Sequence, residues 1–134
     1  MIARDLRVDT SRSRVLDVTD QVARFCREAG GDGLLNVFVP HATAGVALME
    51  TGSGSEADLV EALQRLLPPD DRYTHTHGSR GHGADHLLPV LVAPSLVIPV
   101  QDGRMQLGTW QRVVVVDLNA DNPQRTVRLS LLPG

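Results

Sequence analysis

The sequence predicts an α+β domain with mixed or antiparallel β-sheets and two or three helices. Short apolar runs typical of strands gather towards both ends of the chain, and helical patterns lie between them. Strands and helices do not alternate regularly, as they would in a doubly wound parallel sheet. With 134 residues the chain is close to the commonest size of one domain, and no linker interrupts it. We therefore expect residues 1–134 to form a single domain.

The first third of the chain is predicted to form two strands and a helix. Residues 2–8 and 14–18 are short runs rich in branched side chains, as strands are. The helix is expected to be capped by Thr19 or Asp20 and to end at Gly30. One face of this helix carries the apolar residues Val22, Phe25, Cys26 and Ala29.

The middle of the chain is predicted to form two strands followed by a helix. Residues 34–39 and 44–49 are mostly apolar strands. Ser55 is the expected N-cap of the helix, and Pro68 ends it. Its inward face carries Leu59, Leu63, Leu66 and Leu67. The histidine-bearing segment that follows is expected to be a loop, and residues 86–92 to begin a short helix.

The last third of the chain is predicted to be β-structure. Residues 96–100 form a strand, residues 101–104 a turn, and a short strand then runs to Leu107. Residues 113–118 and 126–132 are two further apolar strands, which we expect to be buried on both faces. In a domain of this size such burial points to contact with a partner subunit, so we expect an oligomer.

The composition argues against several classes of function. A net charge of −3 and a pI near 5.9 provide no basic surface for nucleic acid, and aromatic residues at 3% leave few platforms for stacking bases. No apolar run approaches the roughly 20 residues that span a bilayer. The N-terminus lacks a signal-peptide pattern and Cys26 has no second cysteine to pair with, so we expect a cytoplasmic protein. Cys26 itself is expected to pack in the core.

Four of the five histidines lie in the stretch THTHGSRGHGADH, residues 74–86. His82 and His86 are four residues apart, which on a helix places both imidazoles on one face. His75 and His77 alternate, so either can add a third nitrogen. Three nitrogens with an open fourth position suit catalytic zinc or a related ion. The alternative is a mobile glycine-rich loop whose histidines are only solvated.

Other polar groups are candidates for binding or proton transfer. Glu50 is a possible metal ligand or general base, or an ordinary exposed acid at a strand end, and Asp85 lies within the histidine stretch. The loop from Thr51 to Ser55, with Ser53 at its centre, can bind an anion or simply cap a helix. Three arginines can also bind phosphate, or can be ordinary surface charges. They are Arg80, Arg104 and Arg112.

The stretch SLVIPVQDGRMQLGTWQRV, residues 95–113, resembles the signature of the YjbQ family, the secondary thiamine-phosphate synthase-like proteins. HATAGVALME resembles the family's stretch from a histidine to an Asn-Glu pair, which places His41 and Glu50 at the family's positions. An aromatic residue two places before a histidine gives His75, and the family's second histidine, eleven residues further on, falls on His86.

This resemblance implies a small α+β homotrimer with a pocket that binds a divalent metal, zinc or magnesium, and phosphate. The implied activity is that of a transferase, a secondary thiamine-phosphate synthase: the thiazole nitrogen of a phosphorylated thiazole displaces pyrophosphate from hydroxymethylpyrimidine diphosphate. His41, His75 and His86 would gather at the metal, and Glu50 and His41 would be catalytic. The substrate phosphates would be held by Ser53, Arg104, Thr109 and Gln111.

The chain departs from the family pattern at three places, one of which is the start of the helix after Glu50, where TGSGSE replaces the usual acidic or Asn-rich residues. His82 stands where many relatives carry Asn or Asp, and Met49 replaces the asparagine of the Asn-Glu pair. An imidazole in place of an oxygen ligand shifts the preference from magnesium towards zinc, nickel or another transition ion. Two further functions therefore stay open: a metal-dependent hydrolase, and a noncatalytic trimer that binds a metal or another ligand.

Overall fold

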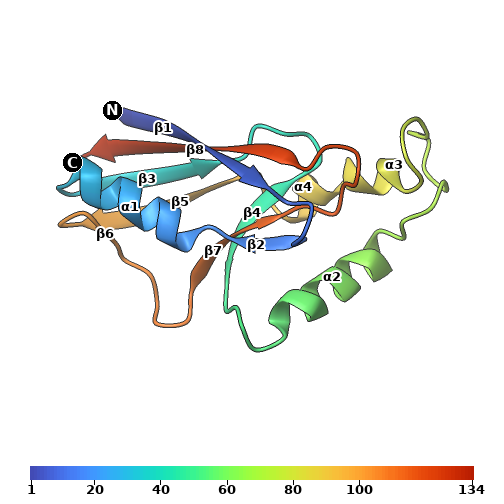
Figure 1. Ribbon diagram of the computed structural model, residues 1–134, viewed down its shortest axis with the longest axis horizontal. Helices are drawn as coiled ribbons and strands as arrows, with labels where there is room; N and C mark the ends of the chain where they lie inside the picture. Colours follow the sequence, from blue (N-terminus) through green and yellow to red (C-terminus); the bar gives the residue numbers. More distant parts are fainter.

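Two antiparallel β-sheets form the body of the molecule (Figure 1). The computed structural model describes residues 1–134. Its elements are β1 (Ile2–Asp9), β2 (Val15–Asp17), α1 (Thr19–Ala29), β3 (Gly33–Phe38), β4 (Gly45–Met49), α2 (Ser55–Leu66), α3 (His82–Asp85), α4 (Leu88–Leu91), β5 (Ser95–Gln101), β6 (Arg104–Met105), β7 (Arg112–Val116) and β8 (Gln124–Pro133). One sheet has the strand order β1-β8-β3-β5-β6 and the other β2-β7-β4. The predicted α+β class is confirmed.

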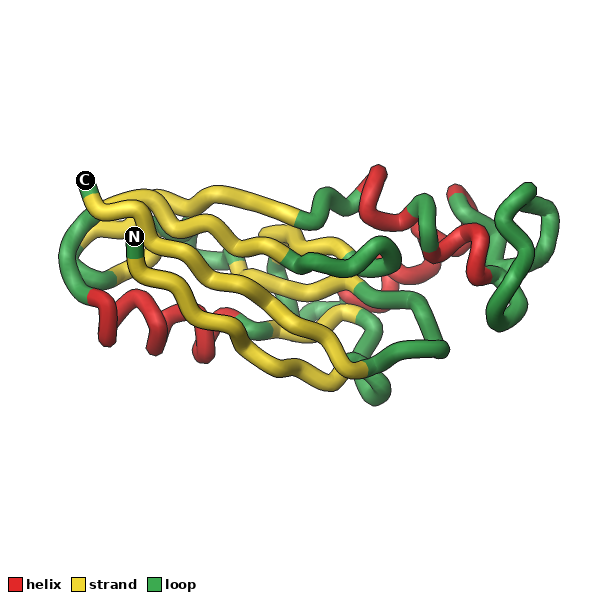
Figure 2. Tube along the Cα trace, turned by 90° about the horizontal axis from the view of Figure 1, so that it is seen from above, coloured by secondary structure: helices red, strands yellow, loops and turns green.

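The larger sheet packs its inner face against α1 and the smaller sheet. Along β8, Val127, Leu129 and Leu131 are buried and alternate with more exposed residues, because successive side chains of a strand point to opposite faces. Phe25 and Cys26 of α1 belong to the same core, so the expected core position of Cys26 is confirmed. The outer face of this sheet has no helix or strand over it (Figure 2).

The smaller sheet lies between two hydrophobic cores, one against each of its faces. In β7, Val113 and Val115 face the core beneath the larger sheet, whereas Val114 and Val116 face a second core with Leu63 of α2. The expected burial on both faces is correct for β7, whereas β8 exposes Leu132 in the single chain, so burial of its outer face against a partner subunit stays a prediction. Because the chain's own helices complete the burial of β7, this strand is no evidence for a partner subunit.

The helices begin and end close to the expected residues, but their caps differ. α1 begins at Thr19, whose backbone N–H donates to the Asp17 carboxylate at 2.9 Å, instead of being capped by its own side chain. α2 begins after Gly54, which has φ of 99°, so Ser55 is the first helical residue and not the N-cap. Gly54 takes this role because a positive φ is unstrained without a Cβ.

The histidine segment is not only a loop, because α3 interrupts it. Gly81 precedes α3 with φ of 83°, and α4 follows within three residues. α3 lies at the end of the long molecular axis opposite to the two chain termini and to β6 (Figures 1 and 2). None of the helices is both long and apolar enough to cross a bilayer.

Candidate functional site

Three histidines converge beside α3. One nitrogen each of His75, His82 and His86 lies within 4.8 Å of the other two, and all three residues are partly buried. The Nε2 atoms of His82 and His86 are only 3.0 Å apart. Two imidazole nitrogens at this distance need a proton or a cation between them. The geometry thus brings together two of the histidines expected from the family resemblance, and adds His82.

The backbone of α3 explains why these side chains meet. The N–H of His86 donates to the carbonyl of His82 at 3.2 Å, so the two residues stand one helical turn apart on the same face. His75 reaches the cluster because Gly83 is buried against it. A Cβ on Gly83 would collide with the carbonyl oxygen of His75 and with the side chain of Tyr73. The glycines of this segment therefore permit close packing.

His82 is held by groups on the β7–β8 loop. Its Nδ1 lies 3.1 Å from Oδ2 of Asp121 and 3.3 Å from Nδ2 of Asn119. The Asn119 amide is oriented by its Oδ1, which accepts the N–H groups of Asp121 and Asn122, while its Nδ2 donates to Asp85 at 3.1 Å. A carboxylate at this distance is a partner for a protonated Nδ1, so we assign the proton there. This tautomer leaves the Nε2 lone pair free for the cluster.

The other two histidines are also suited to donate a lone pair. Nδ1 of His75 is buried and has no hydrogen-bond partner. Burial, followed by the charges of the neighbouring histidines, lowers the pKa of His86 and so favours its neutral form. The ring of His77 lies 4.0 Å from that of His75, between centroids, but His77 does not belong to the converging group.

A buried ion pair anchors the β7–β8 loop behind the histidines. Arg125 donates to Asp117 through Nε at 2.7 Å and through an Nη at 3.0 Å, and both side chains are almost fully buried. The Asp117 carboxylate also accepts the backbone N–H of Asn119 at 3.0 Å. Asp85 completes this polar region; burial raises its pKa, and the Asn119 hydrogen bond opposes that rise. The buried ion pair thus holds the β7–β8 loop, which supports His82, in place.

His41 lies beside this network and not among the converging histidines. Its Nε2 accepts the backbone N–H of Thr126 at 2.9 Å, so this nitrogen is already engaged. Burial, and next the positive charge of Arg125, lower the pKa of His41. The structure therefore does not join His41 to His75 and His86 within one chain. Its metal and catalytic roles stay predictions.

The remaining expected site residues are spread over other parts of the surface. Glu50 and Ser53 are exposed in the β4–α2 loop, and the length of α2, about 18 Å at 1.5 Å per residue, separates this loop from the histidine segment. Arg104 is exposed on β6, at the opposite end of the molecule from α3 (Figure 1). Thr109 and Gln111 are exposed in the β6–β7 loop, where Gln111 accepts the N–H of Gly108. None of these residues reaches the histidines within one chain.

Sequence reasoning missed Asp121 and Asn119. They lie more than thirty residues from His82 in sequence, and nothing local distinguishes DLNADNP from an ordinary polar turn. The one available signal is the density of Asn and Asp between two apolar strands, which also marks turns without any function.

Comparisons with known proteins place this arrangement in a family. Residues 4–134 match the family model described as UPF0047 protein YjbQ-like. The UPF0047 protein Rv2556c of Mycobacterium tuberculosis is 65% identical over 129 residues, which cover 96% of either chain. A UPF0047 protein of Archaeoglobus fulgidus is 34% identical over 116 residues, 87% of this chain and 90% of that one.

Solved structures have the same fold. The hypothetical protein APE1520 of Aeropyrum pernix K1 matches with a TM-score of 0.91 and 38% identity, covering all of both chains. A YbjQ-like protein of unknown function from Sulfolobus solfataricus P2 matches with a TM-score of 0.91 and 25% identity, covering 99% of this chain and 97% of that one.

These comparisons correct the activity expected from the resemblance. The relatives carry only the family designation, the Sulfolobus protein is described as one of unknown function, and none of these descriptions indicates thiamine-phosphate synthesis. The assignment as a thiamine-phosphate synthase, and with it as a transferase, is wrong as a reading of the family. Within one chain, the expected phosphate ligand Arg104 on β6 and the histidines beside α3 also lie at opposite ends of the molecule (Figure 1).

Proposed function

The chain belongs to the UPF0047 YjbQ-like family, and we propose that it binds one divalent transition-metal ion through His75, His82 and His86. The observation that carries this proposal is the 3.0 Å approach of the Nε2 atoms of His82 and His86, with a nitrogen of His75 converging on the same pair within 4.8 Å. Nδ1 of His75 is also buried without a hydrogen-bond partner. Nitrogens on one tetrahedral zinc ion are spaced by about 3.3 Å, given Zn–N bonds of about 2.0–2.1 Å. Small rotations of the imidazole rings therefore suffice to bring all three onto one ion.

The donor set favours zinc or a related ion over magnesium. Magnesium takes oxygen ligands in an octahedral arrangement and holds its waters tightly, whereas imidazole suits zinc, copper, nickel and iron. The contact of His82 with Asp121 strengthens this choice. Metal-bound histidines commonly donate their second ring N–H to a carboxylate, which orients the ring and raises the basicity of the ligand nitrogen.

Three protein nitrogens leave room on the ion for an exchangeable ligand. An ion bound in this way supplies a Lewis acid with an open coordination position. Around it, Asp121 holds the Nδ1 proton of His82, and Asn119 donates a hydrogen bond to the neighbouring Asp85. The low pKa of His86 keeps its imidazole neutral and able to coordinate at a lower pH than an isolated histidine could.

The metal content of purified variants tests this proposal. His75→Ala, His82→Ala and His86→Ala should each lose most of their zinc after dialysis, measured by elemental analysis per chain. His41→Gln is the matched control and should keep its zinc, because the structure places it outside the cluster. Thermal unfolding with a chelator present would show whether each variant folds.

Two results would contradict this ligand set. Full zinc occupancy in any of the three alanine variants would remove that histidine from the site. A loss in His41→Gln equal to theirs would instead favour His41 as a ligand, as the family resemblance implies.

We also propose that the chain assembles as a homotrimer through the outer face of the larger sheet. Leu34 on β3 pairs with Leu132 on β8 and with Pro99 on β5, and the adjacent Val97 is 58% exposed. This contiguous apolar surface supports a protein contact, since monomers seldom leave such surfaces uncovered.

Light scattering on purified variants tests the assembly. The natural chain should have three times the mass of one chain, and Leu34→Glu should reduce it, because a carboxylate would be buried without a partner. Leu66→Glu is the matched control, since Leu66 is an exposed leucine on α2. A monomeric natural protein at micromolar concentration would overturn the proposal, and dissociation by Leu66→Glu alone would move the contact to α2.

A further inference from the structure

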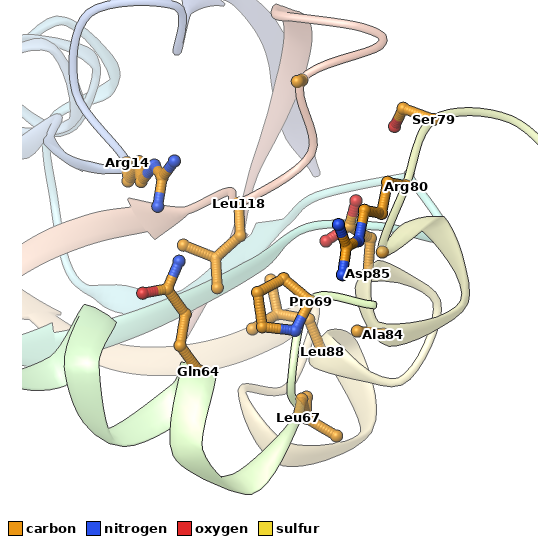
Figure 3. A pocket seen from close by; sticks show the side chains of 12 residues that line it. Arg14, Gln64, Leu67, Pro69, Ser79, Arg80, Ala84, Asp85, Leu88 and Leu118 are labelled. Atoms are coloured by element: carbon orange, nitrogen blue, oxygen red, sulfur yellow. The ribbon is translucent and has the colours of Figure 1, made fainter. Parts of the chain in front are cut away.

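A cavity of about 160 Å³ lies beside α3 and is lined by Ala84 and Asp85 of that helix (Figure 3). It is enclosed by the end of α2, by α3 and α4, and by the loops β1–β2 and β7–β8. None of the five histidines lines it. The cavity is therefore separate from the proposed metal site, although α3 contributes a wall to each.

The cavity has an apolar interior and a polar rim. Leu67, Leu88 and Leu118 form much of the apolar lining, and Leu88 is almost completely buried. Arg14 and Gln64 stand on one side of the opening and Arg80 on the other (Figure 3). A ligand that fits must combine a small apolar body with a polar group at one end.

The charges at the rim favour an anion with one negative charge. Arg14 and Arg80 form no ion pair, whereas Arg72, Arg112, Arg125 and Arg128 each have a carboxylate within 4.0 Å. Asp85 is the acidic residue of the lining, and it already accepts a hydrogen bond from Asn119. Among the lining residues, two guanidinium groups and one carboxylate leave a single net positive charge, and Asp70 adds a further negative charge near Arg80. This balance suits a monoanion better than a doubly charged phosphate.

We propose that this cavity binds a small organic carboxylate, with its apolar body among Leu67, Leu88 and Leu118 and its carboxylate between Arg14 and Arg80. Guanidinium groups suit this ligand because they bind carboxylates through paired hydrogen bonds. Its size is limited, since a cavity of about 150 Å³ accommodates benzene and drug-sized ligands need roughly 300 Å³ or more. Binding here does not require the metal ion.

Calorimetric titration of the chelator-treated protein with benzoate tests the proposal. The titration is done at low ionic strength, because salt would screen the charges of the exposed arginines. Benzoate should bind, and benzamide, which has the same shape without the charge, should bind at least about tenfold more weakly. 2-Naphthoate should also bind more weakly than benzoate, because its second ring exceeds the cavity volume.

Two arginine variants locate the binding. Arg14→Gln and Arg80→Gln should each weaken benzoate binding by about tenfold or more. Arg12→Gln should leave it unchanged, because Arg12 is an exposed arginine of the same β1–β2 loop that does not line the cavity. Both rim side chains are on exposed residues, so the variants should fold as the natural protein does.

Several outcomes would overturn the proposal. They are the absence of benzoate binding at millimolar concentration, equal binding of benzamide or 2-naphthoate, unchanged binding in both rim variants, and an equal loss in Arg12→Gln. Because the protein carries no metal in this experiment, a failure here is distinct from a failure of the metal-site proposal.

Discussion

Removing the carboxylate of Asp121 should weaken metal binding without removing a metal ligand. In Asp121→Ala, Nδ1 of His82 loses a charged acceptor at 3.1 Å, so the ring is no longer held in one orientation or tautomer. Such supporting partners typically contribute about 10–100-fold to metal affinity. The Asp121 side chain is 40% exposed, and solvent screens part of its charge. We therefore expect the lower end of that range, about a tenfold loss of metal affinity.

Competition for zinc against a chromophoric chelator measures this loss. Asp121→Asn should fall between the natural protein and Asp121→Ala, because its side chain keeps a neutral acceptor but no charge. Ser79→Ala is the control for loop anchoring, since the Ser79 hydroxyl donates to Asp121 at 2.9 Å and does not touch His82. Unchanged affinity in Asp121→Ala, or an equal loss in Ser79→Ala, would refute the reasoning.

Three further changes test the surrounding structure. Asp117→Ala should lower the free energy of unfolding by about 3–5 kcal/mol in urea titrations, because Arg125 is left as an unpaired buried charge; an unchanged midpoint would argue against this. Burial and the Arg125 charge hold the folded-state pKa of His41 below 6.5, so its contribution to stability is complete above that pH and is lost as the pH falls through the lower value. His41→Gln, which keeps an acceptor for Thr126, should therefore lose less stability than the natural protein between about pH 7 and about pH 5; parallel losses would count against it. Gly45→Ala should lower the free energy of unfolding by about 1–3 kcal/mol and so lower the melting temperature, because the added Cβ would overlap the carbonyl oxygen of Val92. An unchanged melting temperature would contradict that packing.

The strands and the two longer helices could be predicted because their signals are local. The alternation of buried and more exposed residues along β8 reflects the geometry of an extended chain, and the apolar stripe of α1 reflects helical periodicity. Both follow from side chains within a few residues of one another. The caps were harder to predict, because Asp17 and Gly54 stand outside the residues whose pattern indicated the helices.

The histidine site was only partly predictable. Spacing alone indicated that His82 and His86 would share a face, and this required α3, which the glycines on either side of His82 made hard to foresee. The family resemblance favoured His41 as the third ligand, whereas the fold engages His41 with the backbone of Thr126. His75 is presented by its close packing on Gly83, a contact that no local pattern encodes.

By itself, the sequence determined the α+β class, the order of the strands and the two longer helices, and the supply of imidazole nitrogens in one short segment, because composition and periodicity are properties of neighbouring residues. The tertiary structure decided which nitrogens meet, which nitrogen of His82 faces the cluster, and that Arg14 and Arg80 border one cavity. These outcomes depend on contacts between residues far apart in the chain. The contact of Asp121 with His82, for example, exists only because α3 packs against the β7–β8 loop.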